Sequence, residues 1–224
     1  MARTTVLCGG LFFVGLLFTI ADLIGRASFQ GDITIGGAGF WEAVYSYKLV
    51  MKYGAMLLIG CAVCAFRMGL VARSKNAPYV AHWMIVAALV VLVAATKYWA
   101  LYSFALDAIR DTDDRIGLPL TAPAIAVVAL AIFSVPYWRF FWDLYPPLRR
   151  WLCLSAGLYL SGQVVLEAVS EHLWYAYGST ALSYVAVTAL EELSEIGGAT
   201  IAIGAMMHYG VARSEEAPSP NGGA

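Results

Sequence analysis

Apolar stretches of about 20 residues follow one another along most of this chain. A helix of that length crosses the ~30 Å hydrocarbon core of a bilayer. Strands of membrane barrels are shorter and alternate apolar with polar residues, so these continuous stretches favour helices. The chain is 61% hydrophobic and only 13% charged, whereas a soluble domain carries about 25% charged residues. The sequence therefore predicts an all-α integral membrane protein.

Six transmembrane helices, forming one bundle over residues 1–213, are the simplest division of the sequence. The expected spans are 5–24, 47–71, 82–106, 118–137, 151–175 and 182–211. No small-residue cleavage site follows the first span, so we interpret it as a retained helix rather than a signal peptide. Residues 214–224 are rich in Pro, Gly and Ser, and we expect a disordered cytoplasmic tail there.

Basic residues predict how this bundle is oriented in its membrane. The six-span division places the loops after the second and fourth spans on the same side as both termini. Those regions hold Arg67, Arg73, Lys75, Arg139, Arg149 and Arg150. Because Lys and Arg are enriched in cytoplasmic loops, we expect the N and C termini to be cytoplasmic.

Acidic side chains lie inside the last two apolar segments. The fifth span contains Glu167, Glu171 and His172, and the sixth contains Glu191, Glu192 and Glu195. A charged residue at the centre of a membrane helix costs about 2.5–3.5 kcal/mol on insertion scales. Each of these carboxylates therefore needs a partner, which can be a metal ion, a proton, a lysine or a polar substrate.

The acidic groups of the two spans are expected to face each other. The spans are antiparallel and joined by a short loop, and a rise of about 1.5 Å per residue places both groups between the midplane and the outer surface. Residues three and four apart share one helix face, as Gln163, Glu167 and Ser170 do. Further charged residues are expected in the same outer half: Asp22, Lys48, Lys52 and Lys97.

Each of these residues also has a purely structural interpretation. The glutamates and Lys97 can form a salt-bridge network that only fixes the packing. Glu191 and Glu192 are adjacent and point about 100° apart, so one of them can face another helix or subunit. His172 lies next to an aromatic stretch near the expected interface, where histidine is common. Cys61 and Cys64 form a CxxC pair whose simplest role is that of small buried apolar residues.

The last span reads Glu191-Glu192-Leu193-Ser194-Glu195-Ile196-Gly197-Gly198. This motif, with the preceding glutamate-containing span, resembles a family of uncharacterised six-span bacterial membrane proteins with a late E-E-x-x-E-M-x-G motif. An acidic loop follows the third span in that family, and here Asp107 matches it while Asp113-Asp114 replaces a His-Glu pair. The resemblance covers about half the chain and implies no known activity. It implies a multi-pass protein of the bacterial inner membrane whose Asp107 loop belongs with the glutamates.

Three functions remain open from the sequence. The favoured one is a metal-dependent enzyme acting on a lipid-like or quinone-like substrate, with His172 and Lys97 as candidate catalytic groups. Its Mg, Ca, Mn, Fe or Zn ion would be held by Glu167, Glu171, Glu191, Glu192, Glu195 and Asp107. The alternatives are a proton- or cation-coupled transporter and a structural subunit of a larger membrane complex. The expected partners are the lipid bilayer and either a second copy or other membrane subunits; scattered basic residues do not indicate nucleic-acid binding.

Overall fold

The chain folds into long helices. The computed structural model describes residues 2–29, 49–99, 121–178 and 181–215, and these contain no strand. The elements are α1 (Ala2–Phe29), α3 (Leu49–Ser74), α4 (Val80–Tyr98), α6 (Thr121–Trp142), α7 (Pro146–Leu160), the π-helical turn η1 (Ser161–Leu166), α8 (Glu167–Tyr177) and α9 (Leu182–Glu215). The predicted all-α class is confirmed.

Four of these helical segments are long and apolar enough to cross a membrane. They are Thr4–Gly25 within α1, all of α3, all of α4, and the continuous rod Pro146–Tyr177 formed by α7, η1 and α8. Large apolar side chains point outward from them, including Phe13, Val63 and Leu92, which are 58%, 55% and 60% exposed. A surface of this kind suits a lipid environment, so the structure supports the predicted membrane class.

The helix boundaries differ from the sequence prediction at several points. The third helix was expected to reach residue 106, but α4 ends at Tyr98, which puts Lys97 in its last turn. The fifth helix is interrupted by η1, which the sequence did not predict. The expected tail begins at Ser214, but α9 continues to Glu215. Residues 216–224 of that tail and residues 100–106 of the expected third span lie outside the described residues.

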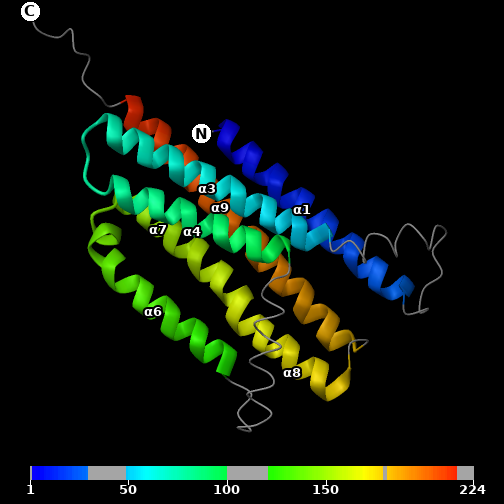
Figure 1. Cartoon of the computed structure of the whole chain (residues 1–224). Helices are drawn as coiled ribbons and strands as arrows, with labels where there is room; N and C mark the ends of the chain where they lie inside the picture. The colour runs from blue at the N-terminus through cyan, green and yellow to red at the C-terminus, as the bar shows by residue number, and fades with distance from the viewer. Residues whose placement is uncertain (1, 30–48, 100–120, 179–180, 216–224) are drawn as a thin grey trace, which may run out of the picture.

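The longest helix, α9, forms the centre of the bundle and packs against α1, α3, α7, η1 and α8 (Figure 1). Three neighbouring helices donate hydrogen bonds to consecutive carbonyls of α9. Ser155 Oγ binds Gly198 O at 2.7 Å, Cys61 Sγ binds Ala199 O at 3.3 Å, and Cys8 Sγ binds Thr200 O at 3.8 Å. Cys61 is 6% exposed, and buried cysteines commonly behave as small apolar residues.

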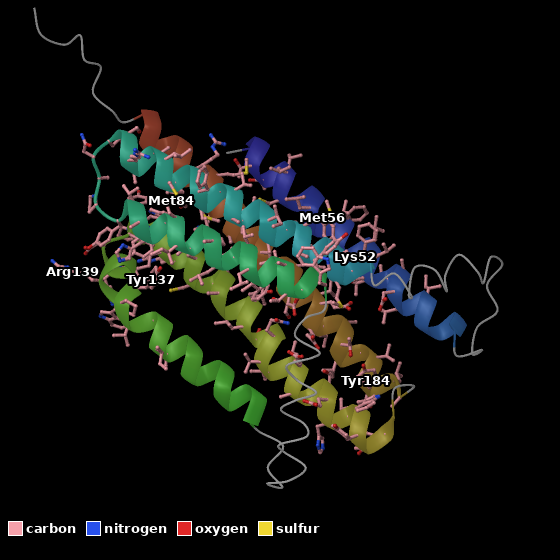
Figure 2. All side chains as sticks on the ribbon, viewed as in Figure 1. Lys52, Met56, Met84, Tyr137, Arg139 and Tyr184 are labelled. Carbon is pink, nitrogen blue, oxygen red and sulfur yellow. The ribbon has the colours of Figure 1, made fainter. Side chains whose placement is uncertain are left out.

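The two ends of the bundle differ in their side chains. The start of α1 and the end of α9 lie at one end, because consecutive long helices run in opposite directions (Figure 1). Arg139 and Tyr137 lie at the end where α6 leads into α7, whereas Lys52 and Tyr184 lie toward the opposite end (Figure 2). α8, which carries Glu167 and Glu171, and the first half of α9, which carries Glu191, Glu192 and Glu195, lie toward the same end as Tyr184.

Candidate functional site

A buried ion pair joins α4 to α9. The Lys97 ammonium binds Glu195 Oε2, and the two side chains are 12% and 3% exposed. The second carboxylate oxygen of Glu195, Oε1, accepts a hydrogen bond from the Gln163 carboxamide of η1. Both oxygens of this carboxylate therefore have a partner, and the partners come from different helices. We call Lys97, Glu195 and Gln163 the polar centre.

Gly54 of α3 leaves space for the Lys97 side chain to reach this centre. A Cβ at Gly54 would stand 3.2 Å from Lys97 Cε and 3.7 Å from Lys97 Nζ. The lysine side chain therefore lies directly against the α3 backbone, and its aliphatic stem is covered while its charge reaches Glu195. Long lysine side chains commonly bury their methylene stems in this way.

Further carboxylates surround the polar centre. Those of Glu192, Glu191 and Glu167 lie near enough to act electrostatically on the Lys97 ammonium. The Ser170 hydroxyl of α8 lies 2.9 Å from the Glu167 carbonyl and 3.3 Å from Glu191 Oε2, so its single proton is shared between these two acceptors. The structure thus places Glu167 of α8 and Glu191, Glu192 and Glu195 of α9 on packed helices within the electrostatic influence of Lys97.

The predicted charged neighbours on α1 and α3 lie close to this part of the bundle. Asp22 is buried in α1 with 5% of its surface exposed. Its helix passes α9 beside the polar centre, because a Cβ at Gly15 would lie 2.6 Å from Ile196 Cγ2. Lys52 Nζ lies 6.0 Å from the centre of the Tyr98 ring, at the outer limit for a cation–π contact.

Three other candidate residues are either distant from the polar centre or outside the described part of the chain. His172 is exposed on α8, and no contact joins it to the polar centre within the described ranges. Asp107 and Lys48 lie outside the described residues. Within the part of the chain that the structure describes, no group of three or more His, Cys, Asp or Glu side chains is arranged to hold a metal ion. The catalytic and metal roles therefore stay predictions.

Sequence reasoning missed two features of the site. Gln163 was placed on the polar face of its helix, but the π-helical turn that carries it was not expected. The role of Gly54 was not predicted, because a single glycine in an apolar helix is compatible with many explanations. The only local signal for η1 is Gly162 followed by two β-branched residues, Val164 and Val165, after Gln163, a combination that weakens a regular α-helix.

Comparisons of the chain with protein-family models, with curated proteins and with solved structures found no match.

Proposed function

We propose that this chain is a six-span membrane protein with both termini cytoplasmic, and that it is a transporter coupled to the movement of a proton or another small cation. In this proposal the cation competes with Lys97 for the Glu195 carboxylate. The ion pair between these residues is the observation that carries the proposal. A lysine ammonium already occupies a carboxylate in a buried position, so a second positive charge can take its place without creating an unpaired anion.

The charges around the pair support the same proposal. The Lys97 ammonium binds Glu195 and also lies within the electrostatic influence of Glu192, Glu191 and Glu167. Carboxylates that lie near one another in a medium of low dielectric constant favour uptake of protons or cations. Ionisable side chains within membrane helices commonly mark ion pathways and proton relays. The residues of the polar centre come from α4, η1 and α9. Displacement of Lys97 would therefore change contacts between these elements.

A flux assay in proteoliposomes tests this function. We expect the wild type to move protons, or one of a panel of monovalent cations, down an imposed gradient. Glu195→Gln should reduce that flux at least about tenfold, because an amide cannot take up a cation in exchange for Lys97. Asp143→Asn is the matched control, since Asp143 lies at the other end of the bundle and binds Tyr79. Absence of flux for every ion, or equal flux in Glu195→Gln, would contradict the proposal.

Metal analysis separates this proposal from a metal-dependent enzyme acting on a lipid-like or quinone-like substrate. We expect no stoichiometric metal in the detergent-purified wild type, because both oxygens of Glu195 already have protein partners. Mass spectrometry of the metal content should be run beside Glu195→Gln and Glu167→Gln. About one divalent ion per chain in the wild type, lost in both variants, would instead support the metal site.

A further inference from the structure

The rod formed by α7, η1 and α8 holds one residue more than a regular helix would. The Glu167 backbone N–H donates to the carbonyl of Gly162, five residues earlier, as in a π-helix. In a continuous α-helix each residue advances about 100°, so Glu167 would point about 120° away from the direction of Ser155. A π-helical turn absorbs one residue and takes back about 100° of that rotation.

The rod contacts α9 on both sides of this turn. Before it, Ser155 Oγ donates to Gly198 O at 2.7 Å. After it, Ser170 Oγ donates to Glu191 Oε2 at 3.3 Å. α7 and α8 therefore present the same side of the rod to α9. A regular helix that was one residue shorter would do the same. The extra residue is not needed for the contacts of the flanks, so its effect must lie within η1 itself.

Within η1 the turn lies directly against α9. A Cβ at Gly162 would stand 2.9 Å from Glu191 O and 3.1 Å from Glu195 Cγ. The next residue, Gln163, donates its carboxamide to Glu195 Oε1. π-Helical turns are rare and occur mostly as single turns at functional sites. The widened turn thus coincides with a side chain of the rod that binds the buried carboxylate of the ion pair.

We propose that η1 is a functional insertion, whose extra residue places the Gln163 carboxamide on Glu195 without changing how α7 and α8 pack on α9. Gln163 is then a positioning residue: it holds Glu195 Oε1 while Lys97 holds Oε2. This inference rests on the proposed role of Glu195 as the exchangeable carboxylate. It adds that η1, through Gln163, affects how readily Glu195 exchanges its ionic partner.

Deletion of Val165, which is 58% exposed, tests the proposal because it removes the extra residue and returns the rod to a regular helix. Packing is read by disulfide formation in two cysteine pairs, identified by peptide mass mapping. Ser170→Cys with Glu191→Cys reports on α8, and Leu158→Cys with Gly197→Cys reports on α7. We expect both cysteine pairs to form disulfides in the deletion variant, as they do in the chain that retains Val165.

The position of Gln163 is read by the infrared carboxylate band of Glu195, assigned by subtracting the spectrum of Glu195→Gln. The Val165 deletion and Gln163→Ala should shift this band in the same direction, whereas Val165→Ala, which keeps the length of η1, should not. An unchanged band in the deletion variant would overturn the proposal. Loss of either cross-link would also overturn it, because η1 would then be required for packing. Neither readout depends on flux, so failure of the proposed transport would be recognised separately.

Discussion

Lys97→Met should destabilise the protein by about 3–5 kcal/mol, because it leaves the Glu195 carboxylate buried without its counter-charge. Glu195 is 3% exposed, so water cannot replace the ammonium. The remaining partner, the Gln163 carboxamide, is a neutral donor and offsets only part of the loss. Equilibrium unfolding in mixed detergent micelles, followed by circular dichroism, measures the change.

The double variant Lys97→Met, Glu195→Met distinguishes the ion pair from simple packing. Replacing both charges by apolar groups of similar volume is often neutral or stabilising, so the double variant should recover most of the stability. Lys75→Met is the matched control, because Lys75 is exposed in the turn after α3. Additive losses in the double variant, or a loss below about 1 kcal/mol in Lys97→Met, would show that the two charges do not depend on each other.

Gly198→Ala should destabilise the protein by about 3 kcal/mol, at the upper end of the range for overpacking. A Cβ at this position would stand 2.8 Å from Ser155 O and 2.9 Å from Tyr159 N. Both are backbone atoms of α7, so the clash can be relieved only by moving one helix away from the other. That movement would also break the bond from Ser155 to the Gly198 carbonyl. Thermal unfolding in detergent measures the effect.

Gly157→Ala is the control for this substitution and should act in the opposite direction. Gly157 lies in α7 between Ser155 and Tyr159, on the other side of the helix, and a Cβ there would meet nothing within 4 Å. Alanine in a helix interior is favoured over glycine by about 0.5–1 kcal/mol, so this variant should be as stable as the wild type or more so. Equal losses in both glycine variants would contradict the close contact of α7 with α9.

The helical architecture was readable from the sequence because it depends on local composition. Long apolar stretches specify helices wherever backbone groups have no water to bind, and the starts of α3 and α9 fall within two residues of the expected positions 47 and 182. Helix ends were harder to predict from local composition. The end of α4 at Tyr98, for example, precedes the expected residue 106. Four helical segments meet the length and apolarity of a membrane span, and the six-span division stays a prediction.

The polar centre was only partly predictable for a physical reason. Helical periodicity identifies which residues of one helix share a face, and it grouped Gln163 with Ser170, both of which hydrogen-bond glutamates of α9. It does not give the rotation of one helix against another, which decides that Lys97 binds Glu195 rather than Glu191 or Glu192. That choice depends on Gly54, where the missing side chain lets Lys97 lie against α3.

Infrared titration of the Glu195 carboxyl group tests the central claim, that this carboxylate exchanges its ionic partner, most directly. Spectra of the purified wild type are recorded as pH and cation concentration change, and the spectrum of Glu195→Gln is subtracted to isolate this side chain. We predict a reversible change in the Glu195 band as a proton or cation displaces Lys97. A band that stays constant across all conditions in which the protein is folded would contradict the account, because the ion pair would then be a fixed structural contact.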